Sequence, residues 1–328
     1  REKVCYEFFK DLFEKQVSDF NESRASWRGL KIYAIDGFEV ILPRTDDILN
    51  EGYNGRQKSK YSKTYYPRMY IVHAYDVLSR VSKEIYQSDV NDELTGADHL
   101  VSEFEDKSLT LYDRFYFCRR TVKRHRNNYF LARLKSGSNL KAVQGFIDSK
   151  DKRRTVKICG QEVHLFRIKN PKTQKKDYFA TTLPLEWMNN TVIRQLYNQR
   201  WDVETSFKDM TESLKVEQWH SKTLNGCLQE LYARMWLMNY TRIQIFFKSK
   251  FKKNSITRRY KAANFKLVLG WVERNFAKIF QRVKGVLKPL EEIIKRTLEC
   301  RKRHSRSYPR HIKKPQSPYP YVNTVEDL

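Results

Sequence analysis

The stretch that decides the fold is residues 191–217, TVIRQLYNQRWDVETSFKDMTESLKVE. It contains neither Gly nor Pro, and it follows the polar pair Asn189–Asn190, which is typical of a helix N-cap. The spacing predicts one amphipathic helix. Its expected core face is apolar and comprises Val192, Leu196, Val203, Phe207, Met210 and Leu214. A neighbouring face holds a carboxylate among cations and comprises Tyr197, Arg200, Glu204, Lys208 and Lys215. By itself such a face fits either a solvated row of ion pairs or a site for an anionic partner.

The charge balance favours a polyanionic partner. The chain has 64 Lys and Arg against 38 Asp and Glu, a net charge of +26, yet 40% of its residues are hydrophobic. A folded protein with nucleic acid as its partner is the first expectation. No apolar run approaches the roughly 18 residues of a membrane-spanning helix, so no membrane partner is expected. The 5 cysteines show no CxxC spacing, which indicates neither a zinc site nor a disulfide framework. Because the chain begins at Arg1, a preceding N-terminal region is expected to be missing.

Two aspartates stand at the ends of predicted strands. In residues 29–43, GLKIYAIDGFEVILP, alternation predicts a strand ending at Asp36, a turn at Gly37 and a second strand running back over residues 39–42. In residues 108–117, SLTLYDRFYF, Asp113 follows Leu109 and Leu111 on the same side of a strand. An Asp-Gly turn would explain Asp36 equally well without any function.

The remaining segments complete an α/β pattern. Helices are predicted within residues 1–29 and at 92–105, 119–125 and 225–247, with two more before about residue 300, and strands at 69–77, 81–90, 129–135, 142–147, 154–159, 162–169 and 176–183. The polar loop 50–68 offers cations for DNA phosphates, although a solvated basic loop is the alternative. These cations are Arg56, Lys58, Lys60, Lys63 and Arg68. The basic tail 301–321 is expected to be extended.

Three motifs together resemble one family. Tyr197-x2-Arg200-x3-Glu204 resembles the Tyr-Arg-Glu-Lys signature of DDE transposases of the insertion-sequence-four (IS-four) type. Asp36-Gly37 before an apolar run ending in Leu-Pro resembles the family's first catalytic motif. Residues 113–116, Asp-Arg-Phe-Tyr, resemble the second, which is Asp-Arg-Gly-Tyr in the family. The chain departs from the family at Thr211, where the signature Lys would fall, and at Phe115.

The resemblance implies a fold and a division of the chain. The fold would be α/β, a ribonuclease-H-like mixed sheet flanked by helices. A helical N-terminal remnant would occupy residues 1–29, and the catalytic core residues 30–135 and 185–247. An inserted antiparallel β subdomain would occupy 136–184, and a basic helical C-terminal region with its tail would occupy 248–328.

The resemblance also implies a site. Asp36, Asp113 and Glu204 would be the catalytic carboxylates and would hold two Mg²⁺ or Mn²⁺ ions, which prefer oxygen ligands. Other side chains would bind DNA, namely Tyr197, Arg200, Lys208, Lys215 and Arg114. Tyr178 and Phe179 are candidates for stacking on an unpaired base, although strand residues of this kind usually belong to the core.

The implied function is DNA transposition. The chain would cleave double-stranded DNA at transposon ends and join the freed 3′-OH to target DNA by a cut-and-paste route. It would act as a homodimer in the synaptic complex, in the cytoplasm of a bacterium or archaeon and associated with the nucleoid. Two alternatives stay open: an inactive or repurposed transposase-derived DNA-binding protein, and a ribonuclease-H-like nuclease that does not join strands.

Overall fold

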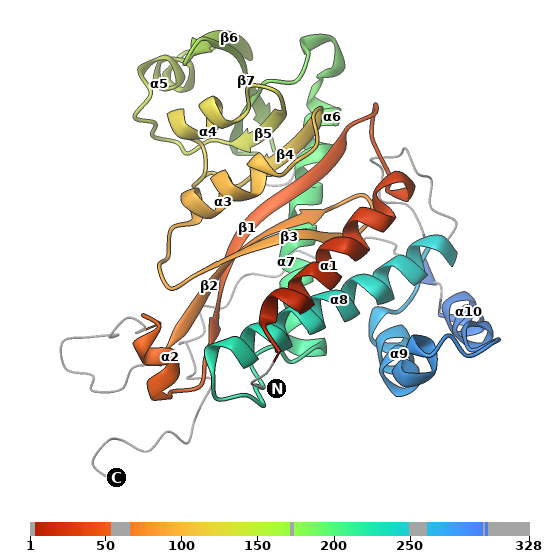
Figure 1. Cartoon of the computed structure of the whole chain (residues 1–328). Coiled ribbons are helices and arrows are strands. Elements are labelled where there is room, and N and C mark those ends of the chain that lie inside the picture. Colours follow the sequence, from red (N-terminus) through yellow and green to blue (C-terminus); the bar gives the residue numbers. More distant parts are fainter. Residues whose placement is uncertain (1–3, 54–65, 171–173, 249–260, 298, 301–328) are drawn as a thin grey trace.

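The protein is an eight-stranded mixed sheet with helices on both faces (Figure 1). The computed structural model describes residues 4–53, 66–170, 174–248, 261–297 and 299–300. The strand order is β3-β2-β1-β4-β5-β8-β7-β6. These strands are β1 (Lys31–Ile41), β2 (Arg68–Asp76), β3 (Val81–Ser88), β4 (Ser108–Tyr112), β5 (Tyr129–Arg133), β6 (Arg153–Ile158), β7 (Gln161–Lys169) and β8 (Lys176–Thr181). A separate pair is formed by β9 (Lys261–Ala262) and β10 (Glu299–Cys300).

The described helices follow the predicted order. They are α1 (Tyr6–Phe20), α2 (Asp46–Asn50), α3 (Glu93–Ser102), α4 (Arg119–Arg124), α5 (Lys141–Asp148), α6 (Asn190–Tyr197), α7 (Trp201–Lys208), α8 (Leu224–Lys248), α9 (Phe265–Phe280) and α10 (Leu287–Arg296). The structure confirms the helices predicted within residues 1–29 and at 92–105, 119–125 and 225–247. It also confirms the two helices predicted before about residue 300. Among the described helices, none is long and apolar enough to cross a membrane.

Strand β1 is one unbroken strand, so the turn predicted at Gly37 is wrong. It pairs antiparallel with β2 from Tyr33 to Ile41, and parallel with β4 only from Lys31 to Ala34. The long ladder with β2 satisfies the backbone groups of residues 37–41, which removes the need for a turn. A Cβ at Gly37 would lie 2.9 Å from Cγ of Glu93, so glycine here makes room for that side chain.

The alternation of β1 separates two cores. Ile32 and Ala34 pack with Leu109 and Leu111 of β4 against α6 and α7. Tyr33 and Ile35 point to the other face, which α3, α4 and α5 cover. Farther along the first face, α1 and α8 lie side by side over β2 and β3 (Figure 1). Asp36 therefore belongs to the face that carries α6 and α7.

The helix predicted over residues 191–217 is interrupted. Asn189 is its N-cap, as predicted, and accepts hydrogen bonds from the backbone N–H groups of Thr191 and Val192, both at 3.0 Å. Between α6 and α7 lies a 3-10 turn, Asn198–Arg200, and a π-helical turn, Asp209–Ser213, follows α7. The helix ends there because the next residues bind α8: Arg234 donates to the carbonyl oxygen of Val216 at 2.8 Å.

One predicted strand is a helix. Residues 142–147 lie in α5, which buries Val143 and Phe146 at helical spacing. A short apolar run fits a buried strand and one face of a helix equally well, so the sequence pattern did not distinguish them. Strands β6, β7 and β8 confirm the other three predictions in this region. They are antiparallel, and β8 pairs with β5, so they continue the main sheet.

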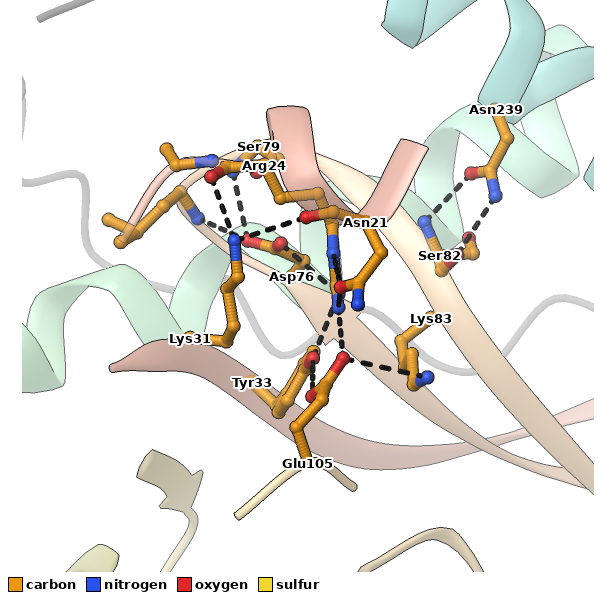
Figure 2. Close-up of polar contacts among 12 residues, drawn as sticks. Asn21, Arg24, Lys31, Tyr33, Asp76, Ser79, Ser82, Lys83, Glu105 and Asn239 are labelled. Atoms are coloured by element: carbon orange, nitrogen blue, oxygen red, sulfur yellow. Dashed lines mark hydrogen bonds and ion pairs between the residues drawn. The ribbon is translucent and has the colours of Figure 1, made fainter. Parts of the chain in front are cut away.

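A buried ionic cluster fixes the start of β1 (Figure 2). The Arg24 side chain is fully buried and lies 3.5 Å from Oδ2 of Asp76, which is also fully buried. Arg24 donates to the hydroxyl of Tyr33 at 2.8 Å and is paired with Glu105. The Tyr33 hydroxyl in turn donates to Glu105 at 2.6 Å. The backbone N–H of Ser79 donates to Oδ1 of Asp76 at 2.9 Å. This cluster joins the segment after α1 to β1, β2 and the entry to β4.

Candidate active site

Asp36 and Asp113 lie beside each other where β1 passes the end of β4. Ala34 pairs in parallel with Leu111, so two residues farther along each strand lead to Asp36 and Asp113 on the same face. Both line a cavity of about 420 Å³. The other lining residues are Asn91, Asp92, Glu93, Leu94, Phe115 and Tyr116. Asp36, within β1, and Asp113, just after β4, therefore open onto one cavity.

Arg200 connects the first of these carboxylates to Glu204. Its Nη1 donates to Oδ2 of Asp36 at 3.1 Å, and its Nη2 donates to Oε1 of Glu204 at 2.7 Å. Only 4% of Arg200 is exposed. The break between α6 and α7 places Arg200 on the 3-10 turn with Glu204 one turn later on α7. A single buried guanidinium thus holds together two acids from distant parts of the chain.

Tyr197 makes the third connection. Its hydroxyl donates to Oδ1 of Asp113 at 3.4 Å, a long hydrogen bond, and its ring packs edge-on against Phe179 at 5.1 Å. Burial, the largest influence, raises the pKa of Tyr197, so the hydroxyl keeps its proton and acts as a donor. The three signature residues Tyr197, Arg200 and Glu204 therefore converge on the two aspartates.

The Asp36 carboxylate is short of positive charge. Burial raises its pKa to about 6, while Arg200 and the N–H of Gly37 act in the opposite direction. Glu93 and Glu204 add to the rise. A carboxylate that one buried arginine does not fully compensate is suited to receive a cation.

This shift predicts a pH-dependent stability. The folded protein binds the Asp36 proton more tightly than the unfolded chain, so this contribution to stability is complete below the ordinary pKa of 3.8 and is lost as pH rises through about 6. Above that pH the ionised group costs about 3 kcal/mol at most. Asp36→Asn should therefore raise Tm at pH 7.5 in EDTA but not at pH 3.5, as measured by thermal denaturation. A lower Tm for the variant at pH 7.5 would contradict this assignment.

Of the other predicted DNA-binding residues, Arg114 lies beside the site, whereas Lys215 does not belong to the helix that carries Glu204. Lys208 is exposed at the last residue of α7. Lys215 lies beyond the helix, which ends at Ser213, and has a φ of 51°, so its expected place on the helix face is wrong. Arg114 is exposed beside Asp113. Arg56, Lys58, Lys60 and Lys63 lie outside the described residues.

The two proposed stacking residues differ in burial. Phe179 is 4% exposed and belongs to the core. Tyr178 is half-buried against Phe146 and lies 5.5 Å from the Arg167 guanidinium. The expectation is wrong for Phe179, which is buried, and stays a prediction for Tyr178.

Sequence reasoning missed the part of the cavity wall that residues 91–94 form, and it gave no role to Tyr116. Glu93 is the first residue of α3 and lies against Gly37 and Asp36. The Tyr116 hydroxyl is buried and makes no hydrogen bond to any described residue. Burial and then Glu93 raise its pKa well above the ordinary value. The only sequence signal for Glu93 is its position after the N-cap Asp92, which marks a helix start and not a site.

The oxygen atoms at the site match the ligands of a hard divalent cation. Asp36, Asp113 and Glu93 line the cavity, while Glu204 is held by Arg200. Throughout the described ranges, no group of three or more His, Cys, Asp or Glu side chains is close enough to hold a metal ion as arranged. The chemistry of the donors and the raised pKa of Asp36 nevertheless fit Mg²⁺ or Mn²⁺. Arg200 binds only Oε1 of Glu204, so the second oxygen of this carboxylate is the one that could hold a cation.

Comparison with known proteins gives the family. The family model described as a transposase DDE domain matches residues 27–240, which include Asp36, Asp113 and Glu204. The match defines the class of the chain as a transposase DDE domain. The chain belongs to the transposase DDE domain family.

Two further comparisons add little. The chain is similar to the piggyBac transposase in a cryo-EM structure of its synaptic complex with hairpin DNA, at 13% identity and a TM-score of 0.46. The match covers 83% of this chain and 58% of that chain, so it spans less than two thirds of the longer protein. A comparison with curated proteins finds no match.

Proposed function

We propose that the chain is a DDE transposase of the IS-four type that cleaves DNA at transposon ends and transfers the cut strand by a cut-and-paste route. The observation that carries the proposal is the contact set of Arg200, which binds Asp36 and Glu204 together. Tyr197 completes it by binding Asp113. Family membership alone assigns the domain, whereas these contacts support an intact Tyr-Arg-Glu signature.

The strand order supports the ribonuclease-H-like part of the proposal. In the run β3-β2-β1-β4-β5, β1 is antiparallel to β2 and parallel to β4, and β4 is parallel to β5. The catalytic core would comprise residues 30–135 and 185–247. The strands β6, β7 and β8 would be the inserted β subdomain, attached through β8.

Asp36, Asp113 and Glu204 would hold two Mg²⁺ or Mn²⁺ ions, with Glu93 beside them. Such ions, when bound, supply an activated water or 3′-OH and stabilise the leaving oxygen in a displacement at phosphorus. Arg200 keeps Asp36 and Glu204 together before DNA arrives. Its planar guanidinium suits bidentate contact with a phosphate, so it can exchange a carboxylate for the DNA backbone. Arg114 and Lys208 would position neighbouring phosphates.

The partner would be double-stranded DNA, with two protomers bridging two ends in the cytoplasm of a bacterium or archaeon. The net charge of +26 supports DNA as the partner, because neutralising phosphates releases bound counterions. DNA affinity should therefore fall by about 10³-fold or more between 50 and 200 mM salt.

A cleavage assay tests this function. The chain is incubated with a duplex that carries the terminal sequence flanking its own gene, and nicks are read on a denaturing gel. Nicks should appear with Mg²⁺ or Mn²⁺ and disappear in EDTA. Glu204→Gln should cleave at least about 10²-fold more slowly, because it removes one charged ligand. Glu212→Gln is the matched control, since Glu212 lies farther along the same helical stretch and its side chain is 62% exposed.

Pre-cut ends separate transposition from simple hydrolysis. With a free 3′-OH supplied, a transposase should join the end to a target plasmid, whereas a nuclease should only degrade DNA. Cleavage in EDTA, or full cleavage by Glu204→Gln, would contradict the proposed site.

A DNA-binding protein without catalysis is the second candidate. It is favoured by Thr211, exposed where the family's signature Lys would fall, and by the position of Lys215 off the helix. Tight binding of the end duplex by the unaltered chain, with no nicking even in Mn²⁺, would select this candidate.

A further inference from the structure

Phe115 is an exposed aromatic ring beside the catalytic carboxylates. Its side chain lies two residues after Asp113, lines the same cavity as Asp36 and Asp113, and is 63% exposed. Leaving a phenylalanine in water forgoes the stabilisation that burial gives, so the ring contributes little to the fold. The next residue, Tyr116, is buried at 1% exposure, so the backbone turns Phe115 outward while anchoring its neighbour.

Two cations accompany the ring. Nζ of Lys135 lies 4.2 Å from the ring centroid and the Arg114 guanidinium lies 5.6 Å from it. Both residues are exposed. They can therefore leave the neutral ring and bind a phosphate when DNA arrives. The cluster therefore offers an aromatic face and two positive charges next to an acidic pocket.

We propose that Phe115, with Lys135 and Arg114, is a stacking platform for an unpaired nucleobase next to the phosphate that the site cleaves. The proposal rests on the proposed function, because DNA must reach Asp113 for the base to lie there. The aromatic ring takes the face of the base, and the cations take the phosphates on either side. A phenyl ring forms no hydrogen bonds with base edges, so any base is accepted.

The ligand is an unpaired base because a base inside a duplex has no free face. Inside a duplex each base is already stacked on its neighbours, so Phe115 gains a partner only at an end, a flap or a flipped-out nucleotide. The alternative rings near the site do not serve. Phe179 belongs to the core, and Trp201, although 41% exposed, is not part of the cavity wall.

The test measures binding in EDTA, so that no cleavage is required. The probes are a blunt duplex and the same duplex with a single-stranded thymine extension that contains one 2-aminopurine. The unaltered chain should bind the extended duplex about 5–150-fold more tightly, the equivalent of one stacked base at ~1–3 kcal/mol. Stacking should also quench the 2-aminopurine fluorescence.

Three variants isolate the ring. Phe115→Ala should lose the preference and the quenching while binding the blunt duplex within about twofold of the unaltered chain. Phe115→Trp should keep both, which shows that the position tolerates replacement. Phe280→Ala is the matched control, because Phe280 is 74% exposed on α9, away from the cavity. Circular dichroism checks that each variant is folded.

The binding results separate the stacking platform from the proposed function. A preference for the extended duplex that survives in Phe115→Ala overturns the platform, and so does equal binding of both probes by the unaltered chain. In those cases metal-dependent nicking can still succeed, so the proposed function stands. Failure to bind either probe would overturn the platform and the proposed function together.

Discussion

Replacing Asp36 by alanine should slow DNA cleavage by about 10³-fold or more while leaving DNA affinity within about threefold of the unaltered chain. Asp36 is the carboxylate with most neighbours at the site: it accepts from Gly37 at 3.1 Å and from Arg200 at 3.1 Å, and it lines the cavity with Asp113. Removing it takes away a central oxygen donor, whereas the cations that bind phosphates remain. Single-turnover cleavage with Mg²⁺ and a binding titration in EDTA measure the two effects separately.

Asp106→Ala is the control for this variant. Asp106 is an exposed carboxylate in the turn before β4, so its loss changes the net charge by the same amount without touching the cavity. Cleavage by Asp36→Ala at the rate of the unaltered chain would remove Asp36 from the catalytic set. A comparable loss in Asp106→Ala would show that net charge, and not the site, controls the rate.

Replacing Arg24 by methionine should lower the free energy of unfolding by about 3–5 kcal/mol. Arg24 is the buried counter-charge of Asp76 and also binds Tyr33 and Glu105 (Figure 2). Methionine fills much of the same space but leaves Asp76, whose side chain is fully buried, without its cation. Urea denaturation followed by circular dichroism measures the loss. An effect below about 1 kcal/mol would mean that the cluster contributes no more than a surface pair.

Two further variants identify the cause of the stability lost in Arg24→Met. Arg296→Met breaks the exposed pair with Glu292, whose side chains are 80% and 67% exposed, and should cost less than about 0.5 kcal/mol. Adding Asp76→Asn to Arg24→Met should restore part of the lost stability, because the stranded charge is removed. If the double variant is no more stable than Arg24→Met, the loss comes from packing and not from charge.

Much of the sheet could be predicted because its strands carry strong local signals. The continuous apolar run of β2, the alternation in β1 and β4, and the apolar content of α8 each gave the correct element. The errors occurred where tertiary contacts decide between local alternatives. Asp-Gly is a residue pair that favours turns, but the ladder with β2 keeps β1 continuous through it. The predicted helix runs past Ser213, where the observed helix ends. Periodicity contains no information about Arg234, which binds the carbonyl oxygen of Val216 in the segment after the helix.

The sequence proposes the members of the site, and the structure adds the contacts between them. Three family motifs brought Asp36, Asp113 and Glu204 forward, and the contacts of Arg200 and Tyr197 agree with their meeting at one place. Arg200 was expected to bind only DNA, because a helical projection does not show that it also reaches a strand on the sheet. Glu93 was missed for a similar reason: only the placement of α3 over Gly37 brings it to the cavity.

The junction of β5 with β8 bears on how the length of the segment between them can change. The N–H of Leu134 donates to the carbonyl oxygen of Tyr178 at 2.8 Å, so the segment that holds α5, β6 and β7 begins and ends at one place in the sheet. This contact closes residues 135–177 into a loop. Doubling the length of that loop would cost only about 0.6 kcal/mol of closure entropy. Changes in the length of the loops within this segment should therefore cost little stability and leave Asp36, Asp113 and Glu204 in place.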